Sequence, residues 1–372
     1  MIYVHVPFCR SFCTYCGFYS EVAPKCHEAY VTALEAEIGA RRNDIDRVFA
    51  SSDVNTLYIG GGTPSVLPLS AFGRLIGALG HGGFKEFTVE VNPEDIVEKG
   101  VDYVKGLLSL GVNRISMGIQ SFDDDILRFM NRRHNSDQAL SAYRILEEAG
   151  VENISIDLIF GLPQLSEQKW SETIDKALKI SASGLPPKHI SAYQLSIEPD
   201  SMLEKLIAKG RFEEASGEQC RQQYEILCRA LAQAGYHHYE ISNFGQPGYE
   251  SRHNSAYWRN VPYVGLGPGA HSYVDRARSW NESSLESYLN TEDFSRIRES
   301  EDLDAEQLAM ERIMLGLRTS DGVEEDFLLS CCDRNAVETA FENGHLTRID
   351  GQRVRIPESS FFISDNIIAS II

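Results

Sequence analysis

The sequence has no apolar run that approaches the roughly 20 residues needed to cross a bilayer as a helix. The segment Met1 to Phe8 has neither a basic flank nor a long apolar stretch, so it does not resemble a signal peptide. Low-complexity segments are absent too, and no unit repeats apart from the strand–helix pairs described below. These absences predict a cytoplasmic protein without a membrane span.

Basic residues are scarce: 35 Lys and Arg stand against 54 Asp and Glu, and the formal net charge is -19. Such a surface repels phosphate backbones and anionic lipids, so nucleic acid is not an expected partner. In a reducing compartment, the eight cysteines predict metal ligands or buried thiols before disulfides. Hydrophobic residues make up 42% of the 372 positions, which is enough for a large core and excludes a disordered chain.

Short β-rich segments alternate with amphipathic helical segments up to about Ser242. Strands begin near Tyr3, Leu57, Phe87, Arg114, Ile154 and Ile190, and helical patterns cover 29–42, 102–110, 137–149 and 169–180. Apolar strands that alternate with helices predict a parallel sheet covered by helices. Six such units predict an α/β barrel, open or closed, with its chemistry at the carboxyl ends of the strands.

The pattern changes after Ser242. Residues 243–273 are rich in Gly, Pro and aromatic residues and show little periodicity, which predicts a long ordered loop region with a functional role. Helical patterns return over 302–317 and 326–340, and residues 346–356 predict a hairpin that turns at Asp350–Gly351. We therefore expect three domains: the barrel (1–242), a glycine- and aromatic-rich extension (243–300) and a small α+β, winged-helix-like domain (301–372).

Three cysteines carry the strongest chemical signal. Cys9, Cys13 and Cys16 follow the first strand with the spacing Cys-x3-Cys-x2-Cys. Thiolates are the ligands that iron–sulfur clusters prefer, and three of them hold three irons of a four-iron cluster while the fourth iron stays open. The alternatives are three unligated thiols or a zinc site, but no fourth Cys or His with suitable spacing adjoins. The other five cysteines have no ligand pattern.

Glycines and polar residues follow several later strands. Gly60, Gly61 and Gly62 precede Thr63 directly after the second strand, where glycines let the backbone approach a ligand and present its N–H groups. Glu90, Gln120, Arg132 and Asp157 stand at or just beyond the ends of later strands. Singly, such residues are often helix caps or surface charges. Together they predict a polar ring at one rim of the barrel, suited to hydroxyl groups and a carboxylate.

The segment from Tyr3 to Phe18 resembles the radical S-adenosylmethionine (SAM) superfamily, and within it the oxygen-independent coproporphyrinogen oxidase branch. The resemblance implies a partial (β/α)6 barrel over about 1–242 and a [4Fe-4S] cluster on Cys9, Cys13 and Cys16, whose open iron binds SAM. It also assigns to SAM binding a set of residues at the rim: Tyr3, Tyr15, Gly61, Gly62, Thr63, Glu90, Gln120, Arg132, Asp157 and Ser196.

A second informative segment is His253-Asn-Ser-Ala-Tyr257-Trp258, followed by the glycine-rich stretch with His271. An imidazole beside aromatic rings suits haem iron, although a buried histidine satisfied by hydrogen bonds is the alternative. His5 and His271 are rival ligands. The string His-Asn-x-x-Tyr-Trp is similar to the signature of HemW-type haem chaperones, which implies haem as a ligand. His253 is our first candidate for its axial ligand.

Two functions compete within this branch. Coproporphyrinogen III dehydrogenases use a 5'-deoxyadenosyl radical to decarboxylate propionates, and they usually have a further Cys at the position of Phe18 and a longer segment before the first Cys. These differences and the His253 string favour a haem chaperone; a related haem-degrading methyltransferase is a third reading. We expect a haem carrier more than a dehydrogenase. The expected partners are haem and an acceptor haem protein, and a homodimer is compatible with the sequence.

Overall fold

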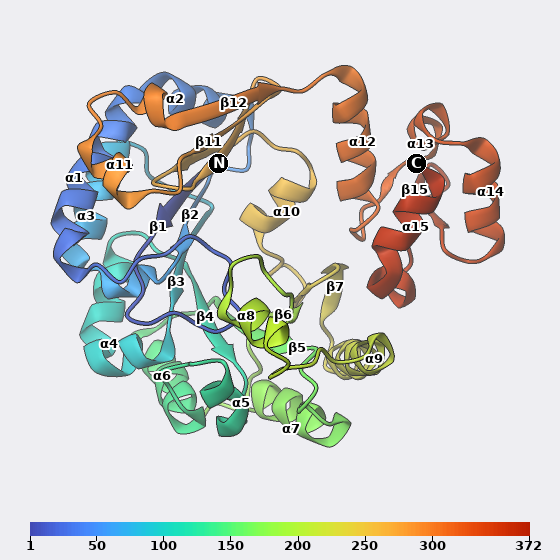
Figure 1. Ribbon diagram of the computed structural model, residues 1–372, viewed down its shortest axis with the longest axis horizontal. Coiled ribbons are helices and arrows are strands. Elements are labelled where there is room, and N and C mark those ends of the chain that lie inside the picture. Colours follow the sequence, from blue (N-terminus) through green and yellow to red (C-terminus); the bar gives the residue numbers. More distant parts are fainter.

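The computed structural model describes residues 1–372 and contains the predicted parallel sheet, curved into an open barrel (Figure 1). Its six central strands lie side by side in chain order, and each pairs in parallel with the next. All six predicted strands are therefore confirmed. Their bounds are β1 Ile2–Val6, β2 Thr56–Gly61, β3 Glu86–Val91, β4 Arg114–Gln120, β5 Ile154–Phe160 and β6 His189–Gln194.

Three further strands extend this sheet at its two edges. β8 (Asn243–Gly245) pairs antiparallel with β6, and β7 (His237–Glu240) pairs antiparallel with β8. At the other edge, β9 (Val264–Leu266) pairs in parallel with β1. The expectation of one long loop over 243–273 is therefore wrong, because this stretch holds β8, β9 and a helix and begins β10. The division into three domains stays a prediction.

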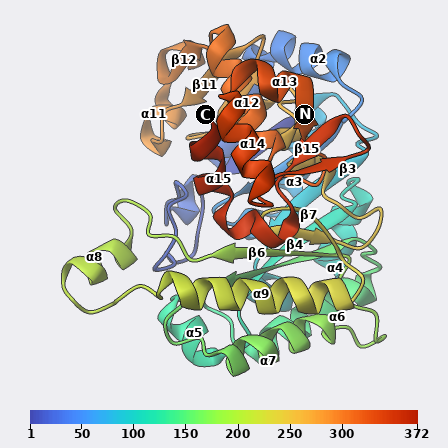
Figure 2. The same ribbon diagram turned by 90° about the vertical axis from the view of Figure 1, so that its right-hand side faces the viewer.

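Helices cover the outer face of the sheet, and Figure 2 shows α7 and α9 lying against each other on it. Polar caps fix where many of them begin: Asn135 forms a reciprocal capping box with Gln138, and Asp123, Ser166, Ser201 and Ser216 accept backbone N–H groups of the first turns. The barrel helices are α1 His27–Ala40, α2 Arg42–Ser51, α3 Leu69–Leu79, α4 Pro93–Ser109, α5 Asp124–Phe129, α6 Ser136–Ala149, α7 Glu167–Leu178, α8 Met202–Ala208, α9 Gly217–Gln233 and α10 Arg252–Trp258. No helix is both long and apolar enough to cross a bilayer.

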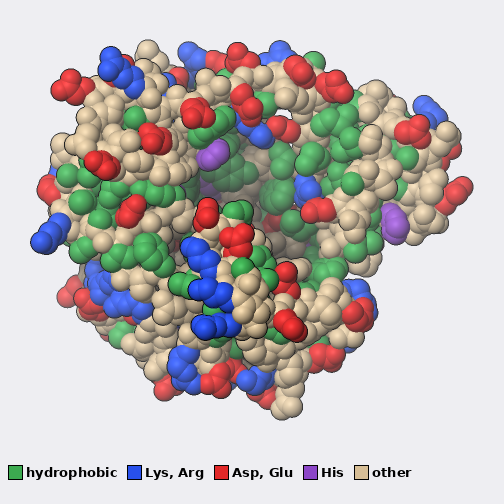
Figure 3. Space-filling model, in the orientation of Figure 1, with side chains coloured by type: hydrophobic (Ala, Val, Ile, Leu, Met, Phe, Trp, Pro, Cys, Tyr) green, Lys and Arg blue, Asp and Glu red, His purple; other side chains and the backbone are tan.

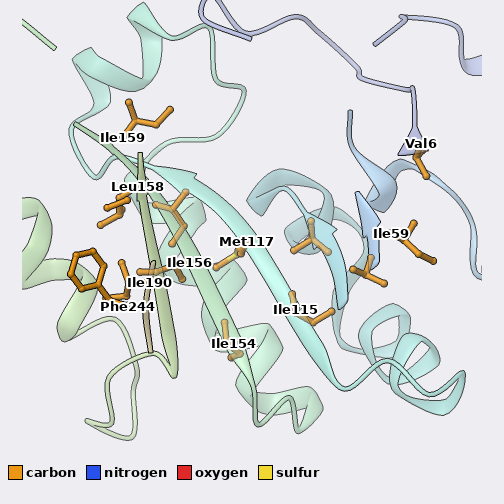
Figure 4. Packing of buried hydrophobic residues seen from close by; sticks show 14 of the residues in the cluster. Val6, Ile59, Ile115, Met117, Ile154, Ile156, Leu158, Ile159, Ile190 and Phe244 are labelled. Atoms are coloured by element: carbon orange, nitrogen blue, oxygen red, sulfur yellow. The ribbon is translucent and has the colours of Figure 1, made fainter. Parts of the chain in front are cut away.

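The strands present one apolar and one polar face, because side chains alternate along a strand. On β4, Ile115 and Met117 are fully buried in the core outside the sheet, whereas Arg114 and Ser116 line the interior of the barrel. Figure 4 shows this apolar layer, to which Ile156 of β5 also belongs. The main core therefore lies between sheet and helices, and the space inside the barrel is left to polar groups.

Two small antiparallel sheets follow the barrel. The first consists of β10 (His271–Val274), β11 (Ala277–Asn281) and β12 (Arg298–Asp302), with α11 (Leu285–Asn290) between the last two strands. The second contains the predicted hairpin and forms, with its helices, the expected α+β unit. Its elements are α12 Ala305–Gly316, β13 Val323–Glu324, α13 Glu325–Cys331, α14 Arg334–Glu342, β14 Thr347–Ile349, β15 Arg353–Arg355 and α15 Ser364–Ile371.

The helix expected over 326–340 is two helices in the structure. Asp333 caps α14 by accepting the backbone N–H of Ala336, and the chain between α13 and α14 leaves helical geometry at Cys332. The expectation of one continuous helix is wrong because an aspartate favours a helix start over a helix interior.

A buried carboxylate joins α1 to the chain that follows β9. Glu37 is fully buried and accepts hydrogen bonds from the Gly267 backbone N–H at 2.8 Å, the Asn281 amide at 2.7 Å and the Tyr288 hydroxyl at 2.7 Å. Arg41, one turn later, is also buried, and its guanidinium lies 4.0 Å from this carboxylate. Glu37 thus anchors α1, β11 and α11 around the edge of the barrel at β1 and β9.

We predict that Glu37→Ala lowers the free energy of unfolding by about 3–5 kcal/mol, since it removes the acceptor of three hydrogen bonds and leaves the buried charge of Arg41 without its neighbour. Urea denaturation followed by circular dichroism measures this change. The control is Glu28→Ala, on the exposed start of the same helix, which should stay within about 0.5 kcal/mol of the parent. Equal effects of the two substitutions would refute the anchoring role.

Candidate functional site

The barrel encloses a cavity of about 770 Å³, a volume typical of small-molecule sites. We call one end the rim: it is formed by the carboxyl ends of the strands and by the loop of residues 9–20 after β1. We call the other end the floor: here α10 crosses the amino ends of the strands, and Glu86 at the start of β3 accepts the Ser251 hydroxyl and the His253 backbone N–H. Figure 3 shows a hollow near the middle of the face that Figure 1 presents.

The three cysteines lie on the loop at the rim. Cys9, Cys13 and Cys16 all line the cavity. The Cys9 thiol lies 3.5 Å from the Thr63 hydroxyl, and the Arg132 guanidinium donates to the Cys13 sulfur at 3.5 Å. Burial raises the pKa of the Cys9 thiol and raises that of Cys16 to about 11. A bound metal would overcome this, because coordination deprotonates a thiol.

The spacing of these thiols does not fit a single metal ion. No three His, Cys, Asp or Glu side chains in the structure come close enough together to share one ion. A four-iron cluster takes each thiolate on a different iron, which suits three cysteines spread along one rim.

The glycine run closes tightly against β1. Gly61 has a left-handed backbone (φ 110°), and a Cβ there would lie 2.6 Å from the His5 ring. A Cβ on Gly62 would lie 2.7 Å from the Phe8 carbonyl oxygen. Side chains are therefore excluded at both positions, and the backbone of this turn faces the cavity next to the cysteine loop, as the sequence predicted.

Glu90 lies directly beside this turn. Its carboxylate accepts the Tyr58 hydroxyl at 2.6 Å and the Gly61 backbone N–H at 3.1 Å. Burial raises the pKa of Glu90 to about 7, a rise to which Asp157 adds and which the two hydrogen bonds and Arg114 oppose. Glu90 therefore changes charge near neutral pH, in contact with the backbone of the glycine run.

Gln120 and Arg132 lie across the cavity from the glycine run, at the end of β4 and beyond it. Gln120 has φ 68°, a left-handed backbone conformation that is rare outside glycine and often marks a functional site. It stands where the register between β4 and β5 shifts. Arg132 donates at 2.7 Å to both the Asn92 side chain and the Gly118 carbonyl. The amide of Asn92 in turn donates to Thr63, so one residue connects the two sides of the rim.

The remaining predicted SAM residues lie on the same cavity wall. Asp157 accepts the Ser116 hydroxyl at 3.3 Å, and burial raises the pKa of its carboxyl group. Burial likewise raises the phenol pKa values of Tyr3 and Tyr15. Ser196 is exposed at the rim and donates to Glu198 at 2.5 Å. The structure thus brings all ten rim residues around one cavity.

Sequence reasoning missed several residues of this cavity, among them Tyr58, Asn92 and Arg114. Tyr58 stands two positions before Gly60, and Asn92 stands two positions after Glu90. Because side chains alternate along a strand, each lies on the same face as Gly60 or Glu90, which the sequence analysis had already selected. Period-two alternation was the signal that would have found them. Arg114 lies further down β4, at the floor.

His253 lies at the floor, remote from the cysteine loop, with only 1% of its surface exposed. Its Nδ1 lies 2.7 Å from the Thr56 hydroxyl and its Nε2 lies 3.0 Å from the Tyr257 hydroxyl, so both ring nitrogens already have partners. Burial also lowers its pKa to about 3. These contacts match the alternative, a buried histidine satisfied by hydrogen bonds, and His253 as axial haem ligand stays a prediction.

The two rival histidines differ from each other. His5 contacts the Tyr3 hydroxyl through Nδ1 (3.0 Å) and the Tyr19 carbonyl through Nε2 (2.8 Å), so its ring is also fully occupied. His271 is exposed on β10, stacks on the Trp280 ring with 5.9 Å between centroids, and its ring has no hydrogen-bond partner within the protein. Of the three, only His271 has a nitrogen available for a ligand.

Comparison with known proteins connects this geometry to a family. Residues 3–177 match the family model described as the radical SAM superfamily. The chain is 35% identical over 331 residues to "Heme chaperone HemW" of Bacillus subtilis, which covers 87% of this chain and 84% of the relative. It is 33% identical to the protein of the same name from Lactococcus lactis, over 98% of this chain and 95% of the relative.

Among solved structures, the chain resembles the coproporphyrinogen III oxidase HemN of Escherichia coli, described as a radical SAM enzyme. The TM-score is 0.79, with 99% of this chain and 89% of that chain covered. Sequence identity is 21%, so this likeness concerns the fold alone; together with the family match it confirms the radical SAM type of α/β fold.

We predict that replacing Cys9, Cys13 or Cys16 singly with Ser abolishes assembly of an iron–sulfur cluster, because a hard oxygen ligand holds such clusters poorly. Anaerobic reconstitution with iron and sulfide, followed by iron and sulfide analysis, measures this loss. The control is Cys26→Ser, which removes a partly buried thiol downstream of the loop and should retain full iron content. Iron content equal to the parent in all three variants would disprove the assignment.

Proposed function

Because the chain belongs to the HemW family of radical SAM proteins, we propose that it is a haem chaperone, which binds haem and delivers it to an acceptor haem protein. Three relatives that are 33–36% identical over 86–98% of this chain carry this name. The likeness to coproporphyrinogen III oxidase, at 21% identity, concerns the fold alone and adds no support to the dehydrogenase reading. The observation that supports the proposal best is the available imidazole of His271 beside Trp280.

The cavity rim is suited to the cluster and to SAM. Cys9, Cys13 and Cys16 would hold a [4Fe-4S] cluster, whose open iron would bind the amino and carboxylate groups of SAM. The backbone at Gly61 and Gly62 leaves room for the methionyl part, and Glu90 presents a carboxylate beside it. Arg132, held by Asn92 and Gly118, places a positive charge on the opposite side.

The haem site lies outside this cavity in our proposal. His271 and Trp280 face the same side of the β10–β11 pair, since they are direct partners in the antiparallel register. The Trp280 ring provides an aromatic surface for a macrocycle. Partial desolvation lowers the pKa of His271, and Arg278 adds to this, which favours the neutral ring that ligation requires. An exposed site also permits transfer, because an acceptor protein can approach it directly.

We predict that SAM binding strengthens from pH 6 to pH 8. Glu90 is protonated below its pKa of about 7, and it is the ionised form that accepts hydrogen bonds and attracts a cationic ligand. For one group, affinity should fall by roughly tenfold per pH unit below the pKa. Isothermal titration calorimetry on reconstituted protein measures this dependence.

The matched variant for this test is Glu90→Gln, which keeps the shape and the acceptor oxygen but does not titrate. Its SAM affinity should change less with pH than that of the parent. Parallel pH profiles for parent and variant would assign the dependence to SAM itself or to another residue.

We predict that the parent binds about one haem per chain with an imidazole ligand, and that His271→Ala shifts the Soret band or weakens binding at least about tenfold, since it removes the iron ligand. The comparison variant is His253→Gln, which removes the floor imidazole; its haem spectrum should match that of the parent. Iron–sulfur content should be unchanged in both, because the cysteines are untouched.

Haem transfer is then measured as the gain of haem absorbance by an apo-haem protein separated from the chaperone. A His271→Ala variant that binds and transfers haem like the parent would place the ligand elsewhere. Absence of haem binding in the parent would refute the chaperone function itself.

A further inference from the structure

Arg114 is a buried cation without a partner in the protein. It begins β4 and is 2% exposed, yet its side chain makes no hydrogen bond and no ion pair, and its Nε is fully enclosed without an acceptor. The alternation that directs Ser116 and Gly118 into the cavity also directs Arg114 there, and all three line it. The charge therefore lies at the floor of the barrel, aimed into the cavity.

Arg132 and Arg355 also have an enclosed Nε without an acceptor, but Arg132 and the buried Arg41 use their other guanidinium nitrogens in hydrogen bonds within the protein, and Arg114 does not. Arg41 donates to the Gly265 carbonyl, the Ser272 hydroxyl and Asp44, and Arg132 donates to Asn92 and the Gly118 carbonyl. An unpaired buried charge costs several kcal/mol, and proteins rarely keep one without a use.

The surroundings of Arg114 do not neutralise it. Asp157 and Glu90 feel its charge, but neither carboxylate forms an ion pair with it, and burial raises the pKa of both. His189, next to it on the floor, is held by Ser155 at 2.8 Å and by the Tyr239 hydroxyl at 2.8 Å, and its pKa is lowered by burial. The floor thus holds a buried guanidinium that forms no ion pair, whereas its neighbour Glu86 is already occupied by the Ser251 hydroxyl and the His253 backbone N–H.

Residues of the segment His253–Trp258 form part of the floor of the cavity near Arg114. His253 is fixed between Thr56 and Tyr257, and the next residue, Asn254, lines the cavity, as do Ser191 and Asn243 from the strands opposite. These residues add hydroxyl and amide groups around the space in front of Arg114. The string is therefore part of the floor of the barrel cavity, where it faces the same space as Arg114.

We propose that the floor of the barrel cavity is a carboxylate-binding site, with Arg114 as its anchor and Asn254 as a second contact. A guanidinium presents two parallel N–H groups that match a carboxylate, and a water-poor chamber strengthens the pairing. The site is separate from the cysteine rim and does not depend on haem binding by His271. We expect a free small carboxylate to supply this group, because SAM would lie at the cysteine rim and haem on the β10–β11 pair. A carboxylate of SAM or of haem that reaches the floor is an alternative outcome of the test.

The first test measures thermal stability of the full chain while propionate replaces chloride at constant ionic strength. We expect the midpoint of the parent to rise saturably by at least about 2 °C, and Arg114→Met to show no rise. The matched control is Arg229→Met, an exposed arginine on α9, which should respond like the parent. Without propionate, Arg114→Met should be at least as stable as the parent, because it removes an unpaired buried charge.

The second test identifies the source. If SAM supplies the carboxylate, Arg114→Met weakens binding of SAM at least about tenfold but not that of decarboxylated SAM. If haem supplies it, the variant weakens binding of haem but not of its dimethyl ester. A response to propionate alone indicates a free carboxylate.

Asn254→Ala is a second, independent variant: it should reduce the propionate response while leaving cluster content unchanged. Equal responses to propionate, SAM and haem in parent and variants would overturn the proposal, as would a parent that propionate does not stabilise. A loss of stability in Arg114→Met without any ligand would instead make Arg114 a structural residue and also overturn it.

Discussion

The inner face of the parallel sheet is polar and yet buried, and most of its groups find partners on neighbouring strands. Tyr58 on β2 donates to Glu90 on β3, and Ser116 on β4 donates to Asp157 on β5. An unpaired polar group in such a place costs free energy, so these contacts fix the strand register as firmly as the apolar layer outside does. Inside this barrel, polar side chains that hydrogen-bond to one another stand where a closed barrel has packed apolar side chains. This arrangement leaves the cavity open.

The rim depends on this arrangement. The glycine run approaches β1 so closely that the positions of His5 and the Phe8 carbonyl leave no room for side chains at Gly61 and Gly62. Asn92 then joins Thr63 to Arg132, and Arg132 reaches Cys13. Groups from β2, β3, the segment after β4 and the cysteine loop are thus connected into one ring before any ligand binds, which reduces the cost of ordering them on binding.

Hydrogen bonds distinguish histidines that look alike in the sequence. His5, His253 and His271 all lie near aromatic residues, and each was a reasonable haem ligand. Two of them use both ring nitrogens within the protein, whereas His271 on the exposed sheet keeps both available. The number of hydrogen-bond partners of each ring therefore indicates a free ligand nitrogen better than proximity to aromatic residues does.

The sequence by itself determined the six parallel strands, the cysteine triad, the glycine turn and most of the rim, because alternation along strands and spacing within loops are local properties. It did not predict that β9 pairs with β1, that 326–340 forms two helices, or that His253 lies between Thr56 and Tyr257. Tertiary contacts join residues that are distant in the sequence: the hydrogen bond between Thr56 on β2 and His253 on α10 spans 197 positions. Only the tertiary structure decided which polar groups are satisfied and which, like Arg114, are not, because satisfaction depends on neighbours that no local pattern specifies.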